Sequence, residues 1–250
     1  MNHTDTPHGV INGASQRFFL ALGENASEVA SRINSEPSFL SQLALFALSG
    51  GFEPSTSQKR SREIMGTNMF GIEDAIKHFG VNPSKAQLAA LSEVPFSEET
   101  LEACKATHVL VAFFPMSTLD IRAAHKDQNL FYNQDWYNKQ AFAKDKGEIG
   151  WHLIRKTPVP ESLNKTWDDQ QKLIGKDDET PKAVVMVYTI IGHYKAMGER
   201  LFEKVWVRCS DLGSDGHRVL VGSFDAEGLG ASSLWDYNRH GHLGLASARK

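Results

Sequence analysis

The chain has 250 residues, of which 41% are apolar and 23% are charged, and its net charge is −3. This composition is ordinary for a globular protein and excludes a wholly disordered chain, while the slightly negative charge gives no electrostatic basis for binding nucleic acid or anionic lipid. Cys104 and Cys209, the two cysteines, are far apart in the sequence, which predicts buried thiols rather than a disulfide framework. No secretory signal or membrane-spanning run is recognisable, so a cytoplasmic location is the default expectation.

A helical region is predicted for residues 1–106. Apolar residues recur at helical spacing over 25–50, where two helices fit. The next stretch, 52–62 (FEPSTSQKRSR), is Ser-rich and basic and contains proline, which predicts a linker and the best candidate for a domain boundary. Beyond it we expect three helices, of which the first ends at Gly80 and the third begins after Ser97 as its N-cap.

Strands and helices alternate in the remainder of the chain, which predicts an α+β fold. The apolar, β-branched run 108–114 predicts a buried strand, and 151–156 predicts a second one. The apolar run within 181–200 fits a strand by composition and a helix by length, and we interpret it as a helix. Further strands are expected on either side of a hairpin turn and, after a long loop, at the end of the chain: 202–209, 217–224 and 243–247.

Three segments near the C-terminus resemble one protein family. They are GERLFEKVWVRCSD, SDGHRVLVGSFD and WDYNRHGHLGLASARK, which precede, span and follow the expected hairpin. On these segments, residues 107–250 resemble the variable proteins of diversity-generating retroelements, which use a C-type-lectin fold of the formylglycine-generating-enzyme type. The resemblance implies a C-type-lectin-like domain over 107–250 that ends in a variable, ligand-binding C-terminus and is preceded by the helical region 1–106.

The same resemblance implies which residues bind the ligand. In that family a reverse transcriptase rewrites template adenines, and the resulting NNY codons cannot encode Lys, Glu, Gln, Met or Trp. None of these five types occurs in 230–234, at Tyr237 or in 240–242. The expected contact residues, with Tyr237 as the main anchor, are therefore Ser223, Gly230, Ala231, Ser232, Ser233, Leu234, Tyr237, His240, Gly241 and His242.

A scaffold role is expected for three residues between those positions: Trp235, Asp236 and Arg239. A Trp side chain can bury a large apolar area, and an Arg side chain can bind several backbone carbonyls through its fork of donors. The expected function is recognition of an unknown protein or glycan without catalysis, without a cofactor, and with avidity if the chain forms a homo-oligomer. The alternative is a structural or assembly protein, of a phage or a surface appendage, with a lectin-like domain of fixed specificity.

Metal binding and catalysis are the remaining alternatives. His240 and His242 form a possible metal-binding pair, but two histidines in a polar loop are weak support, and we expect no metal. The acidic residues near the hairpin match no EF-hand spacing for calcium; they are Asp211, Asp215, Asp225 and Glu227. Oxidase chemistry like that of the formylglycine-generating enzymes needs paired reactive cysteines, and neither Cys104 nor Cys209 has surroundings that predict a low thiol pKa.

Overall fold

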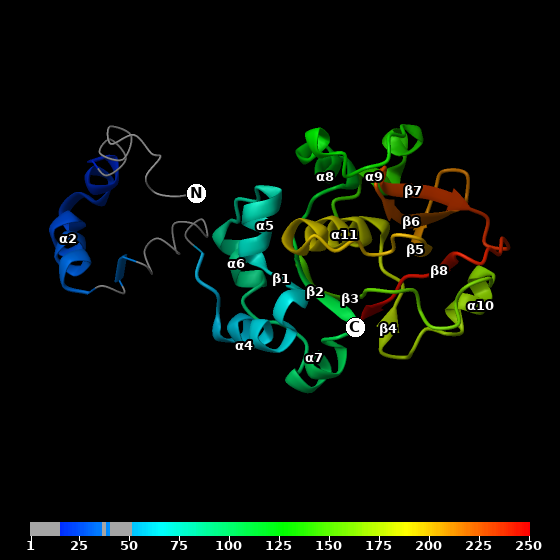
Figure 1. Cartoon of the computed structure of the whole chain (residues 1–250), viewed down its shortest axis with the longest axis horizontal. Helices are drawn as coiled ribbons and strands as arrows, with labels where there is room; N and C mark the ends of the chain where they lie inside the picture. Colours follow the sequence, from blue (N-terminus) through cyan, green and yellow to red (C-terminus); the bar gives the residue numbers. More distant parts are fainter. Residues whose placement is uncertain (1–15, 37–38, 41–51) are drawn as a thin grey trace. The chain divides into compact units, whose positions relative to one another are not determined.

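A computed structural model (Figure 1) describes the chain over 16–36, 39–40 and 52–250. The chain divides into two compact units, 1–51 and 52–250. In the first unit, helix α2 (Ala26–Ser35) directly follows the 3-10 helix η2 (Gly23–Asn25). Helix α2 lies within the helical stretch predicted for 25–50, of which 37–38 and 41–50 lie outside the described residues.

The segment 52–62 is not the linker that its composition predicted. Helix α4 (Thr56–Met65) begins in it, because Ser55 and Gln58 form a capping box. The backbone N–H of Gln58 donates to Ser55 Oγ at 3.1 Å, and the backbone N–H of Ser55 donates to Gln58 Oε1 at 2.9 Å. The buried Gln58 also donates to the carbonyl oxygen of Leu91 at 2.7 Å. Residues 52–106 therefore belong to the same compact unit as the strands that follow.

The three helices predicted between this segment and residue 107 are confirmed as α5 (Ile72–Phe79), α6 (Lys85–Ala90) and α7 (Glu98–Cys104). Helix α5 ends at Gly80, whose φ of 67° is left-handed and suits glycine. The side chain of Ser97 accepts a hydrogen bond from the N–H of Thr100 and so caps α7. A two-residue strand, β1 (Met69–Phe70), precedes α5 and is too short to leave a periodic signal in the sequence.

Two mixed sheets, with helices around them, make residues 52–250 an α+β fold (Figure 1). The five-stranded sheet has the order β1-β2-β3-β9-β4, where β2 is His108–Phe113, β3 is Gly150–Arg155, β4 is Asp178–Glu179 and β9 is Ala248–Arg249. The four-stranded sheet has the order β7-β6-β5-β8, where β5 is Trp206–Leu212, β6 is Arg218–Asp225, β7 is Gly228–Leu234 and β8 is Leu243–Leu245.

Strand β7 corrects the long loop expected after the hairpin. It pairs antiparallel with β6 over most of its length, from Gly230 opposite Gly222 to Leu234 opposite Arg218. The predicted strand over 202–209 also begins later than expected, at Trp206. The C-terminal residues therefore build most of one sheet, rather than a loop mounted on it.

The ambiguous apolar run folds as helix α11 (Ala183–Met197), which is buried over most of its length. It contacts strands of both sheets and lies between them in Figure 1, where it is yellow. A helix that is apolar on all sides is stable when all its sides are covered. This burial explains why the run forms the helix that its length predicted, although its β-branched residues favour a strand. Shorter helices complete the unit: η3 (Gly66–Asn68), α8 (Thr118–Ala124), η4 (Lys126–Gln128), η5 (Trp136–Lys139), α9 (Ala141–Lys144) and α10 (Trp167–Gln171).

Within the described ranges, every helix is too short or too polar to cross a lipid bilayer.

Candidate functional site

The outer face of the four-stranded sheet carries a flat aromatic surface formed by Trp206. In the strand register Trp206 lies opposite Gly222, which in turn lies opposite Gly230. A Cβ atom at Gly230 would lie 2.4 Å from the Cη2 atom of the Trp206 indole, which is far inside van der Waals contact. Gly230 therefore leaves the space that the indole occupies over β7, whereas a Cβ atom at Gly222 would meet the backbone of Val205 and Trp206.

Two surface depressions lie on either side of Trp206 and share it and Ser232. We call the first the histidine depression; it has a volume of about 200 Å³. Its lining residues are Trp206, Leu220, Ser232, Leu234, His240, His242 and Leu243. We call the second the acidic depression; it has a volume of about 260 Å³. Its lining side chains include Tyr132, Gln134, Trp206, Ser223, Asp225, Glu227 and Ser232.

Most of the residues expected to bind a ligand border one of these depressions. Those that line the histidine depression come from β7 and from the segment before β8: Ser232, Leu234, His240 and His242. Ser223 lines the acidic depression from β6. Ser233, Tyr237 and Gly241 line neither depression. Tyr237 is 68% exposed and stacks on Trp235, with ring centroids 6.1 Å apart.

Gly230 and Ala231 differ from the other expected contact residues because they offer no free side chains. Both are buried and border the acidic depression within β7. A side chain at Gly230 would collide with the indole of Trp206. Ala231 pairs with the buried Val221, and its carbonyl oxygen accepts a hydrogen bond from Trp136 Nε1 at 3.1 Å. These two residues shape the surface by being small.

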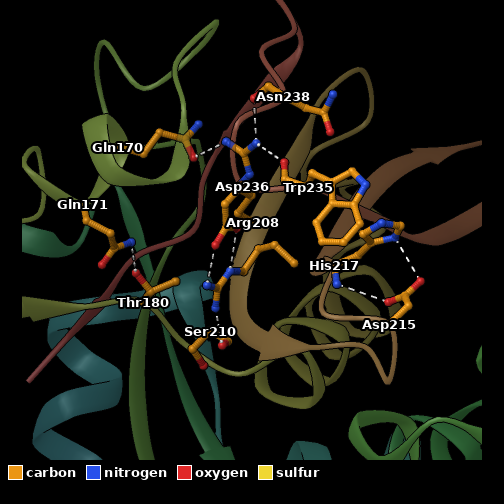
Figure 2. Close-up of polar contacts among 11 residues, drawn as sticks. Gln170, Gln171, Thr180, Arg208, Ser210, Asp215, His217, Trp235, Asp236 and Asn238 are labelled. Atoms are coloured by element: carbon orange, nitrogen blue, oxygen red, sulfur yellow. Dashed lines mark hydrogen bonds and ion pairs between the residues drawn. The ribbon is translucent and has the colours of Figure 1, made fainter.

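A buried arginine holds the segment between β7 and β8 against the sheet (Figure 2). Arg208 on β5 is fully buried, and burial lowers the pKa of its guanidinium. Its Nη1 atom donates to the side chain of Gln170 at 2.8 Å and to a carbonyl oxygen at residue 165, while Nη2 donates to the carbonyl oxygen of Asn238 at 2.7 Å. Nη2 also lies 3.4 Å from the carbonyl oxygen of Trp235.

Arg239 does not make the carbonyl contacts expected of it as a scaffold residue. Its side chain is 59% exposed and lies 4.0 Å from the carboxylate of Asp169, a distance at which an exposed pair contributes little. Arg208 binds the backbone carbonyls that Arg239 was expected to bind. The signal that was missed is the alternation of β5, in which Arg208 shares a face with Trp206.

Asp236 is fixed by a two-point ion pair, in keeping with its expected scaffold role (Figure 2). The Nε and Nη2 atoms of Arg218 donate to its two carboxylate oxygens at 3.1 and 2.9 Å. Arg218 also donates to the carbonyl oxygen of Ser210 and stacks on the Trp167 ring, 3.8 Å from its centroid. Bidentate pairs of this kind fix orientation as well as contributing energy.

Trp235 is not the buried anchor that was expected. It is 44% exposed, and its ring lies against the imidazole of His217, with centroids 4.1 Å apart. His217 is in turn held by Asp215 at 2.9 Å, as Figure 2 shows. The exposed rings of Trp235 and Tyr237 and the half-buried imidazole of His217 therefore form an aromatic group beside the turn of the β5–β6 hairpin.

In the described part of the chain, no group of three or more His, Cys, Asp or Glu side chains is placed to hold a metal ion. The rings of His240 and His242 stack 5.9 Å apart. Asp211 accepts a hydrogen bond from the first N–H of α11. Burial raises the pKa of both Cys104 and Cys209, which disfavours the nucleophilic thiolate form.

No protein-family profile, curated protein or solved structure matches this chain.

Proposed function

We propose that this protein binds a ligand, without transforming it, on the sheet face around Trp206. The observation that carries the proposal is the convergence of two separate segments, 232–234 and 240–242, with Trp206 on the histidine depression. The resemblance to the variable proteins of diversity-generating retroelements implied that these segments bind a ligand. A shared concave surface gives the same residues a common geometric function.

The histidine depression suits recognition of one protruding group rather than enclosure of a small molecule. Its volume of about 200 Å³ is below the roughly 300 Å³ at which pockets begin to enclose drug-sized ligands. The rigid indole of Trp206 offers contact area at low entropic cost, and Ser232, His240 and His242 offer donors and acceptors at its edge. A side chain of a protein partner or one sugar residue of a glycan has the appropriate size.

The hydrogen bonds and the ion pair that Arg208 and Arg218 make with residues 235–238 support this proposal, because they order the segment before a ligand binds. Both arginines bind that segment from the sheet, mainly through its backbone carbonyls and the Asp236 carboxylate. A surface that is ordered before binding loses less conformational entropy when the ligand arrives. It also tolerates changes in the side chains that do not take part in these contacts.

We propose further that the C-terminal surface is diversified, as in the variable proteins of diversity-generating retroelements. The exposed or partly exposed positions at which side chains can change without disturbing the sheet are Ser232, Leu234, Tyr237, His240 and His242. Sequencing the 3′ end of the gene and its flanking DNA across a population tests this. A reverse-transcriptase gene and a near-repeat differing at template adenines are expected; a uniform 3′ end without a repeat leaves a binder of fixed specificity.

The binding site itself is tested by obstructing it. Ser232→Arg places a long side chain where both depressions meet, and Ser214→Arg makes the same chemical change at an exposed hairpin position outside them. A random-peptide library and a glycan array are screened against the wild type and both variants. Ligands of the wild type and of Ser214→Arg should be lost on Ser232→Arg. Ligands that bind all three proteins equally would refute this site.

A further inference from the structure

The acidic depression differs from the histidine depression in charge. Asp225 and Glu227 line it, and none of the described residues around it is basic. Neither carboxylate has an ion-pair partner in the part of the chain that the structure describes; the Asp225 Oδ1 atom accepts a hydrogen bond from the backbone N–H of Glu227 at 2.8 Å. Two carboxylates on one short turn repel each other, and a cation bound between them would relieve that repulsion.

Two aromatic rings accompany these carboxylates. Trp206 borders the depression from β5, and Tyr132, which is 46% exposed, borders it from the segment alongside β7. The backbone N–H of Tyr132 donates to the carbonyl oxygen of Leu229 at 3.0 Å, so its position is fixed against the sheet. The face of a Trp or Tyr ring attracts cations, and Trp does so best. Aromatic faces and carboxylates together favour a cationic group.

We propose that the acidic depression binds an arginine side chain of a protein partner. A guanidinium is planar and weakly hydrated, so it can stack on the Trp206 indole while donating in a fork to the carboxylate of Asp225 or Glu227. A volume of about 260 Å³ accommodates such a side chain. This inference rests on the proposed function and identifies one group of its ligand: a partner protein with an exposed arginine beside the group that enters the histidine depression.

The test compares two small probes that differ in charge. N-acetyl-L-arginine amide carries the guanidinium, and N-acetyl-L-citrulline amide is its neutral isostere. Binding is followed by NMR through the indole N–H signal of Trp206, which Trp206→Phe assigns. The wild type should bind the arginine probe about tenfold more tightly than the citrulline probe, in line with a desolvated cation–π contact.

Charge neutralisation identifies the carboxylates responsible. Asp225→Asn with Glu227→Gln should abolish the preference for arginine, while the new amide at position 225 retains a side-chain oxygen that can accept from the backbone N–H of residue 227. The matched control is Glu93→Gln with Glu99→Gln, two exposed sites that change the net charge equally; it should keep the preference. Melting temperatures of both double variants verify that they fold.

Equal binding of the two probes to the wild type would overturn the inference, and so would a preference that survives neutralisation of Asp225 and Glu227. Such a failure is distinct from failure of the proposed function. If the probe comparison failed but library ligands were still lost on Ser232→Arg, the proposed binding site would stand while the arginine in the acidic depression would be excluded.

Discussion

The guanidinium of Arg208 lies 2.7 Å from the carbonyl oxygen of Asn238, a residue 30 positions later in the chain. This hydrogen bond joins strand β5 to the segment that carries Tyr237 and leads to His240. Arg208 has no carboxylate directly bonded to it among the described residues; its donors bind backbone carbonyls and the amide oxygen of Gln170. The order of the binding surface therefore depends on a buried cation surrounded by neutral acceptors.

Replacing this fork of donors should destabilise the protein. Arg208→Lys keeps the charge but cannot reach all of these acceptors, so we expect the free energy of unfolding to fall by about 2–3 kcal/mol. Arg239→Lys, the matched control on an exposed side chain, should change it by less than about 0.5 kcal/mol. Urea denaturation measures both values, and hydrogen exchange over 235–242 should accelerate in the first variant alone. Equal effects of the two substitutions would contradict the scaffold role of Arg208.

Gly222 is required by the close approach of the backbone at Val205 and Trp206. Its φ is 148°, and a Cβ atom there would lie 2.2 Å from the carbonyl oxygen of Val205. We expect Gly222→Ala to lower the free energy of unfolding by at least about 2 kcal/mol. Gly241→Ala is the control, because a Cβ atom there meets no other atom within 4 Å; chemical denaturation should show a change of less than about 0.5 kcal/mol. A tolerated alanine at 222 would contradict this account of the sheet.

Local signals in the sequence predicted the helices well. Ser97 and Gly80 mark helix ends through backbone hydrogen bonding and left-handed φ, which depend on neighbouring residues alone. The same kind of signal was present at Ser55 and Gln58, three residues apart, but the polar composition of 52–62 was given more weight. Strand β7 was missed because its Gly, Ala and Ser residues have little strand preference; its pairing with β6 stabilises it.

The candidate site was predictable only in part, because burial on the outer sheet face depends on tertiary packing. The family resemblance implied that residues within 232–234 and 240–242 bind a ligand, but nothing in the sequence indicated that Trp206 lies beside them. Arg208 and Arg239 differ in burial because α10 and the segment before it cover Arg208, and this cover comes from residues far away in the sequence. Trp235 and Trp151 likewise differ in burial, and their residue type alone does not predict which of them is buried.

Those two tryptophans should differ strongly in their contribution to stability. Trp235 is 44% exposed, so Trp235→Ala should lower the free energy of unfolding by about 1 kcal/mol, mainly through lost aromatic contacts with His217 and Tyr237. Trp151 is buried, and its Nε1 atom donates to the carbonyl oxygen of Leu91 at 3.0 Å. Trp151→Ala should therefore lower it by about 3–5 kcal/mol. Thermal and urea unfolding check the order, and a larger loss at Trp235 would mean that this residue is a buried anchor after all.

The stability of the fold should depend on pH through His108. Burial, together with the nearby positive charge of Arg155, lowers the pKa of this imidazole from 6.5 to about 4. As the pH falls, His108 of the unfolded chain is protonated near pH 6.5, whereas His108 of the folded chain is protonated only near pH 4. Its contribution to stability is therefore complete above pH 6.5 and is lost as the pH falls toward 4. The loss from this residue is roughly 3 kcal/mol at most.

His108→Gln removes this titration and keeps a polar side chain beside Thr107, whose Oγ1 atom lies 2.8 Å from His108 Nδ1. Urea unfolding of both proteins at a series of pH values should show the wild type losing stability more steeply than the variant as pH falls from 6.5 to 4. Burial also lowers the pKa of His152, which is present in both proteins and cancels in the difference. Parallel curves for the two proteins would mean that His108 accepts its proton as readily when folded as when unfolded.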